Sequence, residues 1–407
     1  MIERTLQKHL SRIAAHFPVV LVTGPRQVGK STLLENFNPE KYEEVSLDDL
    51  NEREQAINDP ALFLQNHQPP VLIDEVQYAP QLFGYIKLYV DKHKGENGLF
   101  LLTGSQKFSL MQGIRESLAG RVAVLDLLGF SENEIQGFPD KPPFLPDECW
   151  LLTAKRQKTP AKTVQDIFTD IWNGSFPRVI NNKGQDRDIF YSSYLQTYIE
   201  RDVKTAYNVS DILTFKNFVR AAAARTGQLL NMSDMAKDVG IDAKTAKTWL
   251  GVLEMSGLVY LLQPYSNNIT NRIVKTPKIY FLDTGLCAYL TGWDGVKSME
   301  AGAMNGALLE TYVFAEILKS YWHNAKQPQI YFYRDKDRRE IDFVIESDNT
   351  LYPIEVKKSV LPDKRAGKNF DVLKTFQKNV AAGVILSLKS EVFYLTENLV
   401  SVPVWAI

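Results

Sequence analysis

Short apolar runs, each followed by polar or charged residues, recur along the first third of the chain. They cover residues 19–22 (VVLV), 70–73 (PVLI), 99–102 (LFLL) and 122–128 (VAVLDLL). Strands of a parallel sheet read as nearly unbroken apolar runs because helices cover both faces of such a sheet. The segments between the runs return to helical spacing, so the pattern predicts a parallel-sheet α/β domain at the start of the chain.

The pattern changes beyond residue 130. A proline-rich stretch at 138–150 (FPDKPPFLPDECW) predicts an irregular connector, and helical spacing returns at 164–172. Near the end of the chain, residues 340–345 and 351–358 alternate between apolar and polar positions around a polar Ser-Asp-Asn-Thr turn. Such alternation predicts two strands of a hairpin, each with one buried face.

Composition places the chain among ordinary globular proteins. Of its 407 residues, 23% are charged and 44% are hydrophobic, and no apolar run approaches the length of about 18 residues that a membrane span needs. The N-terminal residues MIERTLQKHLSRI do not read as a signal or transit peptide. We therefore expect a cytoplasmic protein without a membrane partner.

Charge and cysteine content exclude further classes. The net charge is −1, so affinity for DNA or RNA would have to come from a local basic patch. Cys149 and Cys287 lie far apart, and neither has a histidine neighbour at metal-site spacing. This spacing argues against a disulfide framework and against a structural zinc site.

The first candidate for chemistry is a phosphate-binding loop. Residues 24–31 read GPRQVGKS and match the pattern G-x-x-x-x-G-K-[ST] between a strand and a helix. The glycines let backbone N–H groups turn toward the phosphates, Lys30 reaches the β and γ phosphates, and Ser31 ligates Mg²⁺. We therefore predict ATP and Mg²⁺ as cofactors, with contacts from Gly24, Pro25, Arg26, Gln27, Val28, Gly29, Lys30, Ser31 and Thr32.

Two further strands end in groups that suit phosphoryl transfer. The run at 70–73 leads to Asp74, which would support Mg²⁺, and to Glu75, which is placed to polarise the attacking water as a general base. The run at 99–102 ends in Thr103, Gly104 and Ser105. We expect Ser105 to sense the γ phosphate beside that water, although a simple strand cap and turn would give the same pattern.

Two arginines precede the next strand, at positions 115 and 121. An arginine here could reach a phosphate of its own site or of a neighbouring copy, and would then offset the charge that develops during phosphoryl transfer. We favour Arg121 over Arg115 for this catalytic role. Pairing with a surface carboxylate is the alternative for both residues.

Three motifs carry a family resemblance. GPRQVGKST, LIDEVQ and LLTGSQ, in this order, resemble the archaeal-ATPase-like domain of the AAA superfamily. The later segments GSFPR at 174–178 and YLQTYIERD at 194–202 also resemble a family of bacterial and archaeal ATP-binding proteins with a C-terminal domain of unknown function. The resemblance covers nearly the whole chain, and it implies an AAA-type ATPase domain followed by a second functional module.

Residues 231–250 are typical of a helix-turn-helix. Ser233 and Asp242 are candidate helix caps and Gly240 supplies the turn, while Ala246, Trp249, Leu250 and Leu253 fall on one face of the second helix. The strand-like run from Leu258 resembles the start of a winged-helix hairpin. Lys244, Thr245, Lys247 and Thr248 would face solvent and could meet DNA phosphates, or the unit could serve only for packing.

The C-terminal hairpin carries a second candidate site. Glu355 and Lys357 share one strand face, and antiparallel pairing would bring Asp342 beside them. Glu310, on a helix upstream, offers a further ligand. Such carboxylates form divalent-metal sites that activate water against a phosphodiester, and the order Glu…Asp…Glu-x-Lys resembles the PD-(D/E)xK nuclease superfamily. A surface ion-pair cluster is the alternative.

These patterns divide the chain into four predicted parts. They are an AAA-type P-loop ATPase domain over 1–135, a proline-rich connector and helical segment over 136–205, a winged helix-turn-helix over 206–268 and a PD-(D/E)xK nuclease-like α/β domain over 269–407.

Two functions remain open at this level. The first is a Mg²⁺-dependent ATPase that couples its nucleotide state to DNA binding or cleavage by the C-terminal module. The second is a nucleotide-gated switch or scaffold whose nuclease-like domain binds a partner without cleaving it. DNA, RNA and a protein all stay open as partners, and so does assembly into a homo-oligomer.

Overall fold

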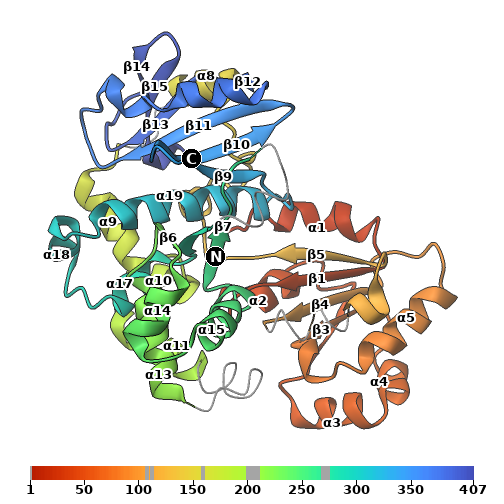
Figure 1. Cartoon of the computed structure of the whole chain (residues 1–407). Coiled ribbons are helices and arrows are strands. Elements are labelled where there is room, and N and C mark those ends of the chain that lie inside the picture. The colour runs from red at the N-terminus through yellow and green to blue at the C-terminus, as the bar shows by residue number, and fades with distance from the viewer. Residues whose placement is uncertain (1, 106–109, 111–113, 157–160, 199–210, 267–275) are drawn as a thin grey trace.

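A computed structural model describes residues 2–105, 110, 114–156, 161–198, 211–266 and 276–407 (Figure 1). The first part is the predicted parallel sheet, with strand order β2-β3-β4-β1-β5. Alternate residues of the interior strand β1 face two different cores, with Val20 and Val22 in one and Val19 and Leu21 in the other. The strands are β1 (Val19–Thr23), β2 (Glu43–Ser46), β3 (Val71–Asp74), β4 (Phe100–Gly104) and β5 (Val122–Asp126).

Helices flank this sheet as the helical spacing predicts. They are α1 (Gln7–Ala14), α2 (Lys30–Glu35), α3 (Leu50–Asn58), α4 (Pro60–Asn66) and α5 (Leu82–Lys92), with short turns η1 (Val76–Tyr78) and η2 (Ile114–Leu118). Because all five strands run parallel, their carboxyl ends lie at one edge of the sheet, where the phosphate-binding loop follows β1. Ligands of open parallel sheets bind at this edge.

The segment predicted as a connector is packed rather than loose. Phe144 of the proline-rich stretch is 1% exposed, and its N–H donates to the hydroxyl of Ser320 at 3.0 Å. The helices of this region are α7 (Glu132–Ile135), α8 (Glu148–Arg156), α9 (Val164–Asn173), α10 (Pro177–Asn181) and α11 (Arg187–Tyr198). The boundary predicted at 205/206 lies outside the described residues.

The next unit has the order helix, strand, two helices and two strands. Its elements are α13 (Ile212–Ala223), β6 (Gln228–Leu229), α14 (Met232–Val239), α15 (Ala243–Met255), β7 (Val259–Leu262) and β8 (Lys278–Phe281). Asp242 caps α15 and Gly240 takes the left-handed turn, as expected. The cap of α14, however, is Asn231 rather than Ser233, since its side chain accepts from the N–H of Asp234.

Strand β8 corrects the predicted boundary at 268/269. It pairs with β7 and β6 in a three-stranded sheet, so residues 278–281 belong with the preceding helices and not with the C-terminal sheet. Sequence spacing suggested otherwise because a long segment separates β7 from β8.

The C-terminal part is a seven-stranded mixed sheet with the order β14-β15-β13-β11-β10-β9, to which β12 adds beside β11. Helix α19 (Asn305–Trp322) lies between this sheet and the helical middle (Figure 1). The other elements are α17 (Thr284–Leu290), α18 (Val296–Ala301), β9 (Ile330–Arg334), β10 (Glu340–Ser347), β11 (Thr350–Lys357), η4 (Lys364–Gly367), η5 (Phe370–Phe376), β12 (Asn379–Val380), β13 (Gly383–Ser387), β14 (Phe393–Thr396), β15 (Leu399–Pro403) and η6 (Val404–Ala406).

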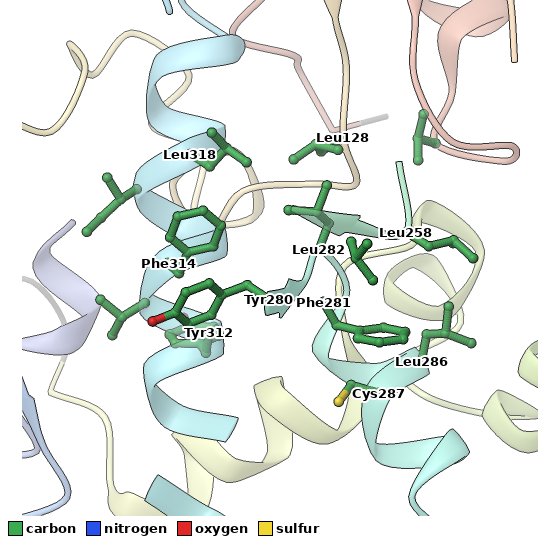
Figure 2. Packing of buried hydrophobic residues seen from close by; sticks show 14 of the residues in the cluster. Leu128, Leu258, Tyr280, Phe281, Leu282, Leu286, Cys287, Tyr312, Phe314 and Leu318 are labelled. Atoms are coloured by element: carbon green, nitrogen blue, oxygen red, sulfur yellow. The ribbon is translucent and has the colours of Figure 1, made fainter. Parts of the chain in front are cut away.

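One hydrophobic core runs through all of these parts. It extends from Leu6 to Ile407, and Figure 2 shows its middle, where Leu128 after β5 packs near Leu282 after β8 and Leu318 of α19. The predicted parts therefore share a hydrophobic core and are not separate domains joined by linkers. No helix among the described residues combines the length and the apolar content that crossing a membrane requires.

Candidate nucleotide site and C-terminal carboxylate cluster

Glycine is required at both ends of the phosphate-binding loop. Gly24 has φ 147°, and a Cβ there would lie 2.0 Å from the carbonyl oxygen of Leu127, which no side chain could tolerate. Gly29 has φ 90° and precedes α2. The ammonium of Lys30 is buried and donates to the carbonyl of Pro25 at 2.8 Å, across the loop. The loop is thus shaped as a backbone cradle with a cation at its centre.

The ends of β3 and β4 meet the loop at Asp74. The hydroxyl of Ser31 donates to Oδ1 of Asp74 at 2.6 Å, and the hydroxyl of Thr103 donates to the same oxygen. Oδ2 of Asp74 accepts a longer bond of 3.4 Å from Ser46 of β2. A hydroxyl and a carboxylate in contact are the oxygen ligands that Mg²⁺ prefers. These two side chains therefore fit the predicted metal.

Glu75 lies beside this group in a left-handed conformation with φ 53°. Its N–H donates to the hydroxyl of Thr103 at 3.2 Å, and its carboxylate accepts from Gln77 and, at 3.5 Å, from Ser105. The structure thus brings together the predicted residues Asp74, Glu75 and Ser105. The sequence did not predict Gln77 as part of the site. This residue lies on the turn after the strand, where no periodic pattern shows which side chains face the site.

Residues from distant segments cover the loop. Pro25 packs against Gly257, the turn that follows α15, and Pro177 of α10 lies next to Gly29. The neighbouring Arg178 and the loop residue Gln27 line one cavity of about 120 Å³. Arg178 is exposed. Arg178 has no predicted role in the sequence analysis, because no local pattern shows that α10 packs next to the phosphate-binding loop.

Arg121 lies at the edge of the parallel sheet opposite to the phosphate-binding loop of its own chain. It precedes β5, whose first residue is paired with Val19, whereas the phosphate-binding loop follows the other end of β1 at Thr23. Its guanidinium forms a bidentate pair with Asp91 at 2.7 and 3.1 Å. A contact with the nucleotide of the same chain is therefore wrong, and only a role toward a neighbouring copy stays a prediction. The side chain of Arg115 lies outside the described part of the chain.

The C-terminal carboxylates converge on the hairpin of β10 and β11. The register Phe343↔Ile354 places Asp342 next to the strand segment that carries Glu355, and β10 is irregular at this point. Oδ2 of Asp342 accepts from the N–H of Val356 at 2.8 Å, and Lys357 donates to Glu355 at 2.6 Å. Bulges that redirect side chains are frequent beside active sites.

Burial and mutual repulsion raise the pKa values of the carboxyl groups in this cluster. Burial raises the pKa of Asp342 well above its usual range, and the neighbouring charges of Glu310 and Glu355 raise it further. Burial also raises the pKa of Glu355, against the opposing effect of Lys357. These directions show that Glu310, Asp342 and Glu355 lie close enough to sense one another.

Glu310 nevertheless does not point freely into this cluster. Lys278 of β8 donates to its Oε1 at 3.0 Å, and the hydroxyl of Tyr280 donates to the same oxygen. Within the described ranges, no group of three or more His, Cys, Asp or Glu side chains is arranged to hold a metal ion. Lys278 and Tyr280 thus pair with one carboxylate oxygen of Glu310, and the role of Glu310, Asp342 and Glu355 as metal ligands stays a prediction.

The exposed face of α15 carries the predicted basic groups. Lys244, Lys247 and Thr248 are exposed. The hydroxyl of Thr245 is used within the helix, since it donates to Asp242 at 2.6 Å, and that of Thr248 donates to the carbonyl of Lys244 at 3.1 Å. Two lysines are thus the main charged groups that this helix offers to a polyanion.

Three family models match successive parts of the chain. Residues 16–136 match an AAA domain, residues 164–297 a domain of unknown function (DUF8612) and residues 305–407 another domain of unknown function (DUF4143). The chain thus carries an AAA-superfamily ATPase domain and a DUF4143 C-terminal domain. The uncharacterized proteins Mb2031c of Mycobacterium bovis and Rv2008c of Mycobacterium tuberculosis are each 28% identical over 88% of this chain and 74% of their own.

Solved structures give weaker similarities. The Walker-type ATPase PABY2304 of Pyrococcus abyssi is 15% identical and covers 71% of this chain and 96% of its own, with a TM-score of 0.43. The RuvB Holliday junction branch migration motor of Thermotoga maritima is 15% identical over 63% of this chain and 88% of its own, with a TM-score of 0.31.

Proposed function

We propose that the protein is a Mg²⁺-dependent ATPase that couples its nucleotide state to DNA binding and processing by its C-terminal half. The observation that carries the ATPase assignment is the contact of Ser31 with Asp74 at the end of β3, with Glu75 as the next residue. A hydroxyl from the phosphate-binding loop, a carboxylate and an adjacent second carboxylate are the groups that phosphoryl transfer to water requires.

Each residue then has a distinct task. Lys30 would leave the carbonyl of Pro25 to meet the β and γ phosphates, and Ser31 and Asp74 are the residues that would hold the metal. Bound Mg²⁺ would neutralise charge on the phosphates. Glu75 accepts the proton of the attacking water, and Gln77 and Ser105 keep its carboxylate in place.

A cation is still needed where negative charge develops on the γ phosphate. Arg178 is the candidate within the chain, because it is exposed and shares a cavity with the loop residue Gln27. Arg121 would serve only from a neighbouring copy, after leaving Asp91. Either arginine would supply the charge compensation that raises turnover in related chemistry.

The element order of residues 212–281 supports a winged helix with α15 as its recognition helix. The hairpin of β10 and β11 supports a nuclease-like module in which Asp342, Glu355 and Lys357, with Glu310 from α19, face a phosphodiester. The carboxylates would hold a divalent ion and Lys357 would contact the phosphate.

Strand β7 supplies the coupling. Its beginning follows Gly257, which contacts Pro25, and its far end continues to Tyr265, whose N–H donates to Phe332 of β9 at 2.6 Å. One short segment therefore touches both the phosphate-binding loop and the C-terminal sheet. A change in the loop on ATP binding has a direct route to the nuclease-like module.

One assay separates the parts of this proposal. ATP turnover is measured with and without double-stranded DNA, in Mg²⁺ and then in Mn²⁺, and nicking is scored in the same tube. We expect ATP hydrolysis that DNA stimulates. Hydrolysis that neither DNA nor RNA changes would overturn the coupling to nucleic acid, and no hydrolysis would overturn the ATPase assignment.

A second function is favoured by Lys278. Because this lysine already neutralises Glu310, the C-terminal half could bind a partner without cleaving it, and the protein would be a nucleotide-gated switch or scaffold. Nucleotide-dependent DNA binding without nicking in either metal would select this alternative.

A further inference from the structure

Lys278 comes from outside the domain whose carboxylates it contacts. It is the first residue of β8, which pairs with β7 and β6, whereas Glu310 lies on α19 and Glu340 begins β10. Its side chain is 3% exposed, and its Nζ lies 3.0 Å from Glu310 and 2.6 Å from Glu340. A buried ammonium that pairs with two carboxylates is held in its position by both of them.

The carboxylates around Lys278 outnumber the cationic side chains that face them. The cluster holds four carboxylates, on Glu310, Glu340, Asp342 and Glu355, and three cationic side chains face them. Lys278 serves Glu310 and Glu340, Arg334 also pairs with Glu340 at 2.7 Å, and Lys357 pairs with Glu355 at 2.6 Å. Within the described residues, the hydrogen bond that Asp342 accepts comes from the backbone N–H of Val356 and not from a cationic side chain. Asp342 is thus the carboxylate least compensated by direct pairing.

A divalent ion and Lys278 would compete for the same carboxylate. Mg²⁺ binds carboxylate oxygens at about 2.0–2.1 Å and requires a nearly octahedral shell. Oε1 of Glu310 accepts from both Lys278 and Tyr280, so an ion would have to displace one of these donors or bind the second carboxylate oxygen. In either position, an ion shared by Glu310 and Asp342 would lie close to the Lys278 ammonium, and repulsion between the two positive charges would oppose its binding.

We propose that Lys278 is a resident counter-ion of the C-terminal carboxylate cluster and competes with a divalent metal ion for Glu310. This inference rests on the proposed function, since it takes Glu310, Asp342 and Glu355 as the metal ligands. It explains why the three carboxylates gather without forming a ready metal cage. It also makes a strand of the winged-helix sheet part of the nuclease-like site.

The test measures Mn²⁺ binding to the full chain in the absence of nucleotide. Binding is monitored by calorimetry and by the loss of the free-ion electron paramagnetic resonance signal. Lys278→Met removes the charge at similar length, and Lys278→Arg keeps it. We expect Lys278→Met to bind one Mn²⁺ at least about tenfold more tightly than the wild type, and Lys278→Arg to match the wild type. Adding Asp342→Ala to Lys278→Met should remove that ion.

A second variant guards against misfolding, because Lys278→Met leaves buried carboxylates without a partner. Lys278→Met combined with Glu340→Gln removes one positive and one negative charge together and leaves Glu310, Asp342 and Glu355 intact. We expect the same gain in Mn²⁺ affinity from this pair. No gain in the folded double variant, or a gained ion that survives Asp342→Ala, would overturn the proposal.

The readout is independent of turnover. ATP hydrolysis measured on the same preparations reports on the nucleotide site, so its absence would contradict the ATPase assignment while leaving the metal result interpretable. An unchanged Mn²⁺ affinity with normal ATP hydrolysis would remove only the role of Lys278.

Discussion

Pro25 in the phosphate-binding loop packs against Gly257, so closely that a Cβ at Gly257 would come within 3.0 Å of the Cγ of the proline. Gly257 has φ 71° and joins α15 to β7, and Leu258 beside it accepts from the N–H of Leu282 after β8 at 2.9 Å. The predicted phosphate-binding loop therefore touches the turn at which β7 starts and beside which β8 ends.

This contact predicts that ATP changes hydrogen exchange in β7 and β8. We expect ATP with Mg²⁺ to slow deuterium uptake at residues 257–262 and 278–282, because an ordered loop restrains the turn. Lys30→Ala is the control, since it should lose both nucleotide and protection. Protection confined to the loop itself would show that the effect of nucleotide binding does not extend to β7 and β8.

Arg178 is predicted to act on the nucleotide. Arg178→Ala should lower ATP turnover by about tenfold to hundredfold, the range expected when one charge-assisted hydrogen bond is lost. Lys183→Gln removes a nearby exposed positive charge from the same segment and should leave turnover close to wild type. Equal effects of both substitutions would mean that general surface charge, rather than Arg178, is responsible.

Gly174 is predicted to be essential for the segment that places Arg178. It has φ 71°, and a Cβ there would lie 2.4 Å from the hydroxyl of Tyr191 and 2.5 Å from Oδ1 of Asp283. Gly174→Ala should therefore lower the free energy of unfolding by at least about 2 kcal/mol. Gly251→Ala, inside α15 with open space around it, should raise it by about 0.5–1 kcal/mol. Urea unfolding of both variants checks these opposite signs.

His323 should make stability depend on pH. It is 1% exposed, and its Nε2 accepts from the N–H of Leu128 at 3.3 Å. Burial lowers the pKa of His323, with smaller lowering by Arg4 and Lys319, against the opposing charge of Glu134. The unfolded chain therefore takes up a proton at higher pH than the folded one. Stability from this group is complete above about pH 6.5 and is lost as the pH falls through the folded pKa.

Urea unfolding between pH 8 and pH 5 tests this dependence. His323→Gln keeps an acceptor for the N–H of Leu128 but cannot titrate. We expect the wild type to lose up to about 1.4 kcal/mol per pH unit from this group, and the variant to show a shallower slope over the same range. Identical slopes would place the acid sensitivity elsewhere.

The phosphate-binding side of the site could be predicted from sequence because each part is local. A loop pattern, two strands that end in carboxylate or hydroxyl groups and the common edge of a parallel sheet suffice to bring Ser31, Asp74 and Ser105 together. The same reasoning argues against Arg121 in its own site, because a residue before a parallel strand lies at the opposite edge. Its position along the chain suggested a catalytic role, but the geometry of the sheet leaves only a role toward a neighbouring copy as a prediction.

Lys278 and Arg178 could not be predicted in this way. The partner of Lys278 lies 32 residues further on, on another element, and the two meet only because β8 joins β6 and β7 against α19. The α10 segment reaches the loop through packing around Gly174 and Asp283. Neither arrangement has a local period or spacing, so tertiary packing alone determines them.

The most direct test of the account compares Lys30→Ala with Glu75→Gln, with ATP binding and steady-state turnover measured on the same preparations. Lys30→Ala should abolish detectable binding of ATP with Mg²⁺, because the cation that meets the β and γ phosphates is lost. Glu75→Gln should bind ATP like the wild type but lower kcat by at least about a hundredfold, because only the proton acceptor changes. Equal loss of ATP binding in both variants, or normal turnover by Glu75→Gln, would contradict the account.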